Sequence, residues 1–255
     1  MNDTMTFQLD GHVALVTGSS RGLGKNIALA LGRAGAKVAF NYFNSEAAAA
    51  ETFAEFEAAG GQGIVVCGDA SNEDDVARMV AEVKGALGPI DILVPNATPD
   101  QPQMPIEEYT WQHCQTMIDF FIKSPFLLTK ACLADMKQSK WGRIINITSE
   151  VYHRSHGDFV AYVSAKGGQI GFTRSMATEL APSGITVNSV APGWIPTERH
   201  ANDPQEAKDG YQAIIPAGRW GTPRDIGDAV LYFASEEASV VTGQTLCVNG
   251  GITPW

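Results

Sequence analysis

The feature that most constrains the fold of this chain is a regular alternation of short apolar segments with longer, helix-length segments. The apolar segments predict strands at residues 12–17, 37–42, 62–67, 90–95, 142–148, 185–190 and 245–248. The segments between them predict helices at residues 24–34, 46–59, 73–87, 109–137, 162–180 and 226–234. Strands joined through helices pair in parallel by right-handed crossovers, and strands that are apolar throughout indicate a sheet covered on both faces.

This alternation continues through residues 1–255 without a linker-like stretch or an internal repeat. We therefore predict one doubly wound (Rossmann) α/β domain, with a mostly parallel seven-stranded sheet and helices on both faces. The predicted helix 109–137 contains Pro125, which we expect to interrupt it because proline lacks the amide hydrogen that an inner helical turn needs.

The charge and cysteine content argue against several classes of function. A net charge of −10 disfavours a nucleic-acid partner and an anionic membrane surface. No stretch reaches the ~20 apolar residues that span a bilayer, and residues 1–11 lack the basic and apolar regions of a signal peptide. The cysteines have no paired spacing, so we expect reduced thiols in a cytoplasmic protein.

A glycine-rich turn, TGSSRGLG at residues 17–24, lies between the first predicted strand and the first helix. Glycines allow a tight turn and close backbone approach, and the helix start offers unpaired amides to an anion, so this position favours a pyrophosphate site. A plain strand-to-helix turn is the simpler alternative. Gly18, Ser20 and Gly22 also match the nucleophile elbow of α/β-hydrolases, but only one strand precedes the turn, whereas that fold needs an earlier loop for its oxyanion hole.

Three further residues suggest proton chemistry. Tyr162 and Lys166 are four residues apart in a predicted helix and so share one face. A nearby cation favours the ionised phenol, which makes a tyrosine a better acid–base group near neutral pH. Ser149 ends the fifth predicted strand, where ligand sites of such sheets open, and its hydroxyl could bind a carbonyl oxygen. A surface aromatic–lysine pair and a strand-end cap are the alternatives.

In this order along the chain, the motifs resemble those of the short-chain dehydrogenase/reductase family, closest in pattern to 3-oxoacyl-acyl-carrier-protein reductase-like members. The matching segments are TGSSRGLG, Asn96-Ala97, INITS ending at Ser149, YVSAK, NSVAPG with Thr197 following, RWGTPRDIGDAVLYFAS and TGQTLCVNGG. They cover nearly the whole chain.

The resemblance implies an oxidoreductase in which three residues handle the carbonyl/alcohol pair. Tyr162 would exchange a proton with the substrate oxygen, Ser149 would orient that oxygen, and Lys166 would lower the pKa of Tyr162 and hold the nicotinamide ribose. The residues implied to contact the cofactor are Gly18, Ser20, Arg21, Gly22, Leu23, Tyr42, Asp69, Ala70, Asn96, Ala97, Thr148, Tyr162, Lys166, Pro192, Gly193, Ile195 and Thr197.

Two positions depart from the family's pattern. Members usually carry an Asn on the helix after the fourth strand, where it supports a water that relays protons to the Lys, but alignment places Phe121 there. Thr98 stands where a Gly is usual after Asn96-Ala97. Because Phe121 offers no amide, the relay must use its backbone carbonyl, another side chain, or nothing. A dinucleotide-binding protein without catalysis therefore stays open as an alternative.

The end of the second strand indicates the cofactor. An acid there would bind the ribose 2′-hydroxyl of NAD and repel a 2′-phosphate. This chain has Tyr42 instead, and the next acid, Glu46, begins the following helix. Since Arg21 could pair with a 2′-phosphate, we predict NADP(H) in preference to NAD(H).

The substrate is less well indicated. The resemblance makes residues 194–218 a mobile lid and suggests a 3-oxoacyl thioester or related ketone, with a sugar, polyol or other small alcohol as the alternative. Between Ser149 and Tyr162, His153, Arg154 and His156 form either a solvated rim or a site for a polar or anionic substrate, and we predict no metal site.

Two further expectations concern partners. Lys137, Lys140 and Arg174 lie on segments that we expect to border the site, where they are available to an acidic carrier protein. However, Ser183 replaces a frequent Arg of that subgroup, and a net charge of −10 opposes long-range attraction. The apolar helices 109–137 and 162–180 correspond to those that pair between subunits in the family. We therefore expect a homotetramer.

Overall fold

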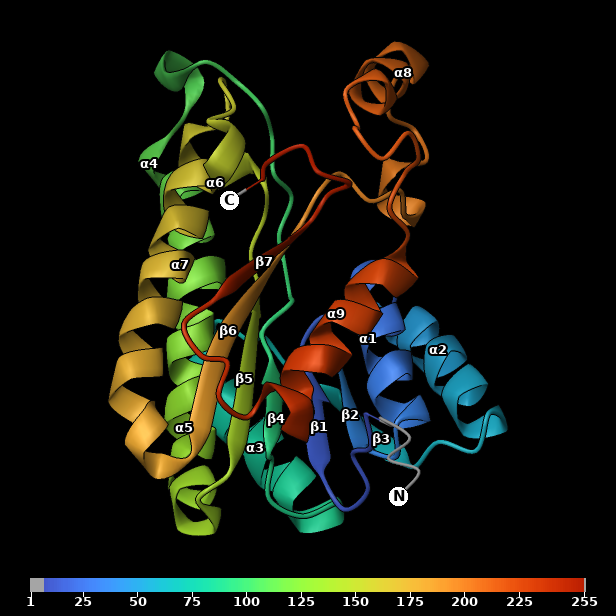
Figure 1. The fold of residues 1–255 in the computed structure, drawn as a ribbon, viewed down its shortest axis with the longest axis vertical. Coiled ribbons are helices and arrows are strands. Elements are labelled where there is room, and N and C mark those ends of the chain that lie inside the picture. Colours follow the sequence, from blue (N-terminus) through green and yellow to red (C-terminus); the bar gives the residue numbers. More distant parts are fainter. Residues whose placement is uncertain (1–6, 255) are drawn as a thin grey trace.

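The computed structural model describes residues 7–254 and contains one sheet of seven parallel strands (Figure 1). Their order across the sheet is β3-β2-β1-β4-β5-β6-β7, so the chain starts in the middle and winds outward in both directions. The strands are β1 Val13–Val16, β2 Lys37–Tyr42, β3 Gly63–Cys67, β4 Ile92–Val94, β5 Gly142–Ile147, β6 Ile185–Pro192 and β7 Thr245–Val248. The predicted fold class is confirmed, and the pairing is parallel throughout the described sheet.

The helices follow the predicted positions, with two additions after β5 and β6. The α-helices are α1 Gly22–Arg33, α2 Glu46–Ala58, α3 Glu73–Ala86, α4 Trp111–Ile118, α5 Ser124–Ser139, α6 Val151–Arg154, α7 Val160–Leu180, α8 Gln205–Ala213 and α9 Pro223–Ala234. The sequence pattern did not predict α6 and α8. Helix α6 has four residues and buries none of them, and α8 buries only Tyr211, so neither carries the set of apolar residues that marks a helix packed on a core.

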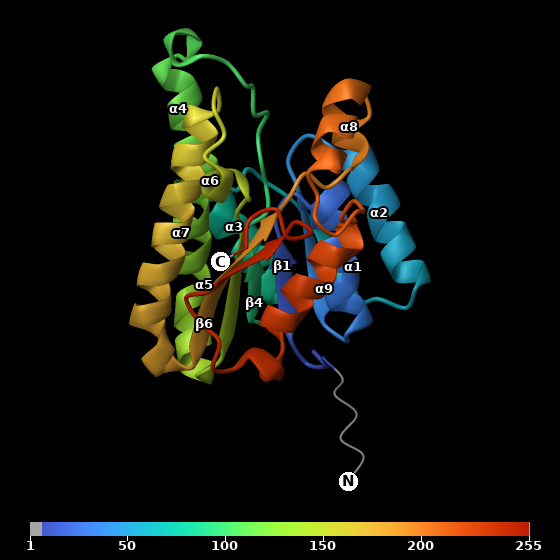
Figure 2. The same ribbon diagram turned by 45° about the horizontal axis from the view of Figure 1, so that its top comes forward.

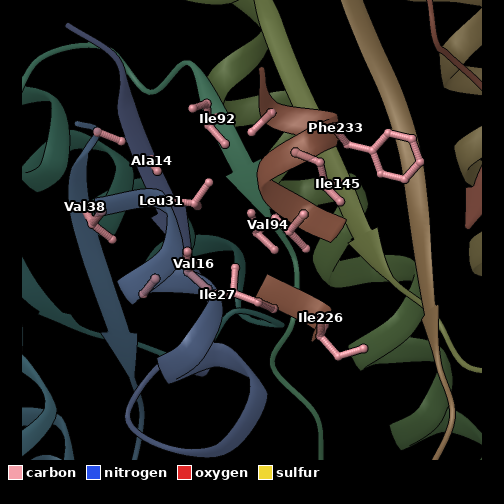
Figure 3. Close-up of a cluster of buried hydrophobic side chains, with 14 of the residues drawn as sticks. Ala14, Val16, Ile27, Leu31, Val38, Ile92, Val94, Ile145, Ile226 and Phe233 are labelled. Carbon is pink, nitrogen blue, oxygen red and sulfur yellow. The ribbon is translucent and has the colours of Figure 1, made fainter. Parts of the chain in front are cut away.

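Helices cover both faces of the sheet, as the apolar strands predicted. Because side chains alternate along a strand, Ala14 and Val16 of β1 face α1, α2 and α9, whereas Val13 and Leu15 face α3, α5 and α7. The first of these two cores is drawn in Figure 3, where Phe233 of α9 and Ile27 of α1 meet side chains of the central strands.

The predicted interruption of helix 109–137 lies immediately before Pro125. A π-helical turn, Asp119–Lys123, separates α4 from α5, and Phe121 lies in this turn. Pro125 lies two residues after this turn, and its missing amide hydrogen and its ring affect the carbonyl four residues earlier, at Phe121 in the middle of the turn. The predicted interruption by Pro125 is therefore confirmed, but its form, a π-helical turn, was not predicted.

Because the strands are parallel, their carboxyl ends all lie at one edge of the sheet, and the segments that follow the strands lie beyond this edge. Helices α4, α6 and α8 lie beyond this edge at the same end of the molecule (Figures 1 and 2). Among residues 7–254, no helix is long and apolar enough to cross a membrane, and no group of three or more His, Cys, Asp and Glu side chains could hold a metal ion. The prediction about a signal peptide partly concerns residues 1–6, which lie outside the described residues.

Candidate active site

The glycine-rich turn connects β1 to α1 and depends on two backbone conformations that favour glycine. Gly18 has φ +63 and Gly22 has φ +59, both in the left-handed region. Gly24 is needed for a different reason, since a Cβ there would lie 2.3 Å from the carbonyl oxygen of Gly18 and 2.6 Å from Asn96 Nδ2. The turn is therefore closed tightly onto its own helix.

Side chains from neighbouring strands fix this turn. Thr17 Oγ1 accepts hydrogen bonds from the amides of Asn96 (2.9 Å) and Ala97 (3.0 Å), and Asn96 Nδ2 donates to the carbonyl of Thr17 at 2.9 Å. Asn41 is 2% exposed; its Oδ1 accepts from the Gly18 amide at 3.1 Å and its Nδ2 donates to the Gly68 carbonyl at 3.0 Å. Asn41 of β2 and Asn96 of the loop after β4 therefore both hold the turn, and the Asn96 side chain does so by bonding to a backbone carbonyl of the turn.

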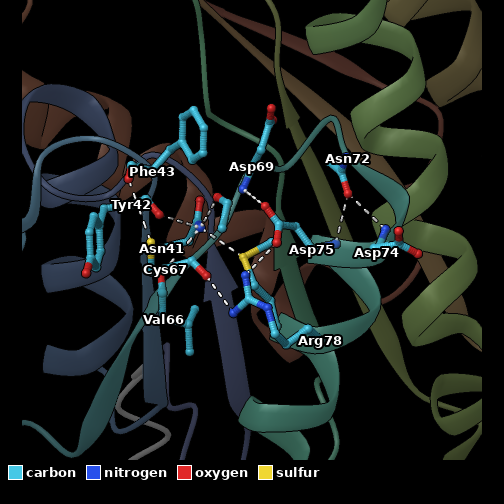
Figure 4. A network of polar contacts seen from close by, with 12 residues as sticks. Asn41, Tyr42, Phe43, Val66, Cys67, Asp69, Asn72, Asp74, Asp75 and Arg78 are labelled. Carbon is cyan, nitrogen blue, oxygen red and sulfur yellow. Dashed lines mark hydrogen bonds and ion pairs between the residues drawn. The ribbon is translucent and has the colours of Figure 1, made fainter.

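The start of α1 differs from the start of α3 at the same edge. Asn72 caps α3 by accepting from the amides of Asp74 and Asp75, and the first turn carries acidic residues (Figure 4). Helix α1 has Arg21 at its N-cap, no side-chain cap and no acid in its first turn. Its open amides and positive end therefore remain available to an anion.

The residues expected near the adenine lie on the same side. Tyr42 ends β2 and is partly buried, and Ala70 is buried after β3. Asp69 Oδ1 accepts from the amide and the hydroxyl of Ser71, both within 2.8 Å, so this carboxylate shapes the loop after β3. The Asp69 amide donates to Asp75 at 2.8 Å (Figure 4). Among the turn residues, Arg21 is exposed and Ser20 is buried with its carbonyl accepting from Thr52.

The three candidate catalytic residues come together beyond the end of β5. Ser149 follows β5, whereas Tyr162 and Lys166 lie on the first turns of α7. Lys166 Nζ is 5.6 Å from the centroid of the Tyr162 ring. Burial raises the pKa of Tyr162 to about 12, and a hydrogen bond with Ser149 together with the charge of Arg199 opposes that rise. The phenol is therefore protonated at neutral pH.

Phe121 lies directly against this pair. Its ring contacts the Tyr162 ring edge to face with centroids 5.3 Å apart, and Lys166 Nζ lies 3.7 Å from its centroid. Met117, Ala161 and Ala165 complete a small buried cluster around these rings. The side chain that departs from the family's pattern is therefore part of the site itself.

Segment 194–218 faces the glycine turn across this edge. A Cβ at Gly22 would lie 3.7 Å from Cβ and Cγ2 of Thr197, so the two segments nearly touch. Ile195 is buried, and Gly193 hydrogen-bonds through its amide to β7 at Val248. Pro192 ends β6, and Thr148 Oγ1 donates to the Val190 carbonyl at 3.0 Å, tying β5 to β6 here.

Helix α8 is fastened to the loop after Ser149 through Tyr211. The Tyr211 hydroxyl donates to Glu150 Oε1 at 2.8 Å and accepts from the Trp194 amide at 2.8 Å. Arg154 pairs with the same carboxylate oxygen at 3.1 Å. Arg154 is therefore engaged inside the protein, which disfavours the hypothesis that it recognises substrate.

A second arginine, Arg199, links segment 194–218 to the loop after β4. It donates to the Pro99 carbonyl at 3.2 Å and lies 3.9 Å from the fully exposed carboxylate of Asp100. Its charge acts on Tyr162, as noted above. Arg199 was not predicted from the sequence, because its relation to Tyr162 depends on how two distant loops approach each other.

The basic residues considered for a carrier protein are not all near this edge. Lys137 and Lys140 lie at the end of α5, just before β5 begins at Gly142. Since Ser149 follows the other end of β5, these lysines are at the opposite edge of the sheet, and the expectation that they border the site is wrong. A helix antiparallel to its strand carries its last residues away from the strand's carboxyl end.

The structure also adds residues that the sequence analysis did not single out. Asn41 and Gln169 are buried polar residues, in an apolar strand and on the inner face of α7 respectively. A polar residue at a position where the pattern predicts an apolar one was the available signal, because buried amides need hydrogen-bond partners. Gln169 Oε1 accepts from Lys166 Nζ at 3.1 Å.

Comparison with known proteins places these features in context. Residues 18–253 match the family model described as enoyl-(acyl carrier protein) reductase. The chain is 40% identical over 246 residues to the 3-oxoacyl-[acyl-carrier-protein] reductase FabG of Vibrio cholerae, covering 96% of this chain and 98% of that protein.

Two solved structures are also similar. A gluconate 5-dehydrogenase from Burkholderia cenocepacia, in complex with NADP and tartrate, has a TM-score of 0.90 at 32% identity and covers 97% of each chain. A 3-oxoacyl (acyl-carrier-protein) reductase from Agrobacterium tumefaciens with NADP bound has a TM-score of 0.89 at 31% identity and covers 96% of each chain.

Proposed function

The chain belongs to the short-chain dehydrogenase/reductase family of oxidoreductases, and we propose that it reduces 3-oxoacyl thioesters to 3-hydroxyacyl thioesters with NADPH. The observation that carries this proposal is the meeting of Ser149, Tyr162 and Lys166 beside an uncapped, glycine-built helix start at the same edge of the sheet. The Vibrio relative named above supports the thioester, since the chain covers 98% of it.

The residues of the turn suit a dinucleotide. The backbone amides of the turn at Ser20, Gly22 and Leu23 would hold the pyrophosphate, because no side chain caps α1 and no acid lies in its first turn. Gly18, whose own amide donates to Asn41, would let the backbone come close to the phosphates. Exposed Arg21 would pair with the 2′-phosphate near Tyr42. The remaining candidate contacts are Asp69, Ala70, Asn96, Ala97, Thr148, Pro192, Gly193, Ile195 and Thr197.

NADPH, when bound, supplies a hydride to the carbonyl carbon of the substrate. Ser149 would donate a hydrogen bond to the carbonyl oxygen and hold it next to Tyr162. Tyr162, which is protonated at neutral pH because burial raises its pKa to about 12, would donate its proton to that oxygen. The positive charge of Lys166 would stabilise the phenolate left behind. Residues 194–218 would act as a lid that excludes water from this step.

One observation favours a second candidate function, the oxidation of a small hydroxy acid. Arg199 faces Tyr162 and its ion-pair partner Asp100 is fully exposed and 3.9 Å away, so the guanidinium could bind a substrate carboxylate. The gluconate 5-dehydrogenase named above was crystallised with tartrate, a dicarboxylate. Arg154 is less suited to this role because Glu150 and the Tyr211 ring already engage it.

A substrate comparison tests both candidates. We expect acetoacetyl thioesters of acyl carrier protein and coenzyme A with NADPH to give a higher kcat/KM than gluconate or other hydroxy acids with NADP. The reverse ranking would overturn the thioester and support the second candidate. In Arg21→Ala, the preference for NADPH over NADH should fall by about 10- to 150-fold, since a hydrogen bond to a charged group contributes roughly 1.5–3 kcal/mol; an unchanged ratio would contradict the assignment of Arg21.

The assembly and location follow from the same proposal. Phe126 of α5 is 51% exposed, whereas Phe121, Leu127 and Leu128 are buried within the domain, so only part of the predicted apolar surface remains for a neighbour. We propose a cytoplasmic homotetramer in which the α5 and α7 faces pair. Light scattering that gave a monomeric mass would contradict the assembly.

A further inference from the structure

The ammonium group of Lys166 is enclosed by the protein. Lys166 is 3% exposed, and Nζ donates to the Ile147 carbonyl at 2.6 Å and to Gln169 Oε1 at 3.1 Å. Burial lowers the pKa of Lys166 well below its usual value. Among residues 7–254, no carboxylate forms an ion pair with Lys166. The positively charged form of Lys166 is therefore stabilised by neutral hydrogen-bond acceptors and not by a carboxylate.

The third side of the ammonium group faces the Phe121 ring at 3.7 Å from its centroid. An aromatic face attracts a cation, which favours the protonated amine as the two oxygens do. Phe121 is 2% exposed and offers its ring face, not a hydrogen-bonding side chain, to Lys166. Two oxygens and one ring face together occupy the three donor directions of an ammonium group.

Gln169 is held in place for this contact. It is 1% exposed and lies three residues after Lys166, so the two side chains share one face of α7. One turn further, Thr173 Oγ1 donates to the Gln169 carbonyl at 2.9 Å, accepts from Asn146 Nδ2 of β5 at 2.9 Å and pairs with Ser189 Oγ of β6 at 2.8 Å. These buried bonds fix this part of α7 against the sheet.

We propose that Gln169 is the positioning residue for Lys166, and that Gln169 and the Phe121 ring together hold the ammonium group in a chain that lacks the usual Asn at position 121. This inference rests on the proposed function, in which Lys166 acts on Tyr162. Because the amide is neutral, Gln169 orients Lys166 without cancelling its positive charge. A carboxylate in its place would neutralise the field that stabilises the Tyr162 phenolate.

The groups that face Tyr162 and Lys166 from the elements around them are few. Ser149 from the loop after β5 and Arg199 from segment 194–218 act on the phenol. The rings of Phe121 and Phe159 pack on it, and the other titratable side chains packed on this cluster are Cys114 of α4 and Tyr109, which precedes α4. A change at Gln169 should therefore reach Tyr162 through Lys166.

The test compares three variants of the full chain. Gln169→Met keeps the volume and removes the acceptor, Gln169→Glu keeps the acceptor and adds a charge, and Asn188→Leu removes a buried amide of β6 that bonds to Val241 and Gln244 away from the site. Each is assayed for kcat and KM, for the pH profile of alcohol oxidation from pH 6 to 11, and for thermal unfolding.

We expect both Gln169 variants to lower kcat by about tenfold or more, with little change in the substrate KM, as a part of the ~10²–10⁴-fold that positioned proton transfer contributes. Their oxidation profiles should move to higher pH. Asn188→Leu should lower the melting temperature and leave the profile in place. Adding Phe121→Asn to Gln169→Met should recover part of the lost kcat, since an amide returns beside Lys166.

A wild-type rate and profile in Gln169→Met would overturn the inference, as would a profile that Asn188→Leu shifts equally. If Gln169→Met does not fold, Gln169→Glu decides the question by its profile alone. The two proposals fail separately: a fully active Tyr162→Phe would contradict the proposed function, whereas an inactive Tyr162→Phe beside an unaffected Gln169→Met would contradict only the role of Gln169.

Discussion

The turn after β1 and the Tyr162 face of α7 lie at the same edge of the sheet but are built from different parts of the chain. The turn presents backbone amides, and its side chains Thr17, Asn41 and Asn96 serve to hold that backbone. The α7 face presents side chains whose properties depend on their surroundings, as the raised pKa of Tyr162 shows. A site made of backbone tolerates side-chain variation, whereas a site made of side chains is sensitive to each neighbour.

This difference agrees with where the chain departs from its relatives' pattern. The turn keeps every glycine that its backbone needs. The departure at Phe121 falls beside Lys166, where Gln169 supplies an oxygen at 3.1 Å. Electrostatic support for a lysine can come from more than one position, because any acceptor within hydrogen-bond distance serves. A left-handed turn has far fewer substitutes.

The largest effect should come from removing the phenol that the α7 face presents. Tyr162→Phe should lower kcat by on the order of 10³-fold, because a positioned acid–base group contributes roughly 10²–10⁴-fold. The dissociation constant for NADPH, measured by fluorescence titration, should change little, since the turn after β1 is intact. Turnover within about tenfold of wild type would place the proton chemistry on another residue.

A smaller effect should follow from a change in the turn, and it should appear in stability and in NADPH binding, the latter of which Tyr162→Phe leaves nearly unchanged. Gly24→Ala places a Cβ 2.3 Å from the Gly18 carbonyl oxygen, so the turn must open. We expect a loss of about 1–3 kcal/mol in the free energy of unfolding and weaker NADPH binding. Chemical denaturation and fluorescence titration measure the two quantities.

Gly85→Ala in α3 is the matched control for this change. A Cβ at Gly85 would meet nothing within 4 Å, so alanine should stabilise the helix by up to ~1 kcal/mol and leave NADPH binding unchanged. If both variants weakened binding equally, the tight closure of the turn would not be the cause.

The smallest effect concerns the charge of Arg199 near the phenol. Oxidation of an alcohol needs the phenolate of Tyr162, so with a pKa raised to about 12 in the free protein the oxidation rate should rise with pH through the alkaline range. The reduction rate, which needs the protonated phenol, should change little over the same range. In Arg199→Ala the pKa of Tyr162 should be higher, because the arginine favours the phenolate, and the oxidation profile should move to higher pH. An unchanged profile would show that Arg199 does not act on Tyr162.

Much of this molecule could be predicted from its sequence. The seven strands lie where the apolar segments predicted them, and β2 and β7 have the predicted bounds. The positions of such strands can be predicted from the local sequence, because a strand that is buried on both faces needs consecutive apolar residues. The glycine turn was equally readable, since a positive φ restricts the residue type at Gly18 and Gly22.

Other features were decided by tertiary structure alone. The π-helical turn at Phe121 leaves no mark in the periodicity of residues 109–137. The contact of Arg199 with the loop after β4, the bond from Tyr211 to Glu150 and the position of Lys137 away from the site all depend on how distant segments pack. The contacts of Lys166 with Gln169 and with the Phe121 ring likewise depend on tertiary packing. The sequence determines which backbone shapes and buried faces are possible, but distances between side chains, and hence their pKa values, are set only when the chain has folded.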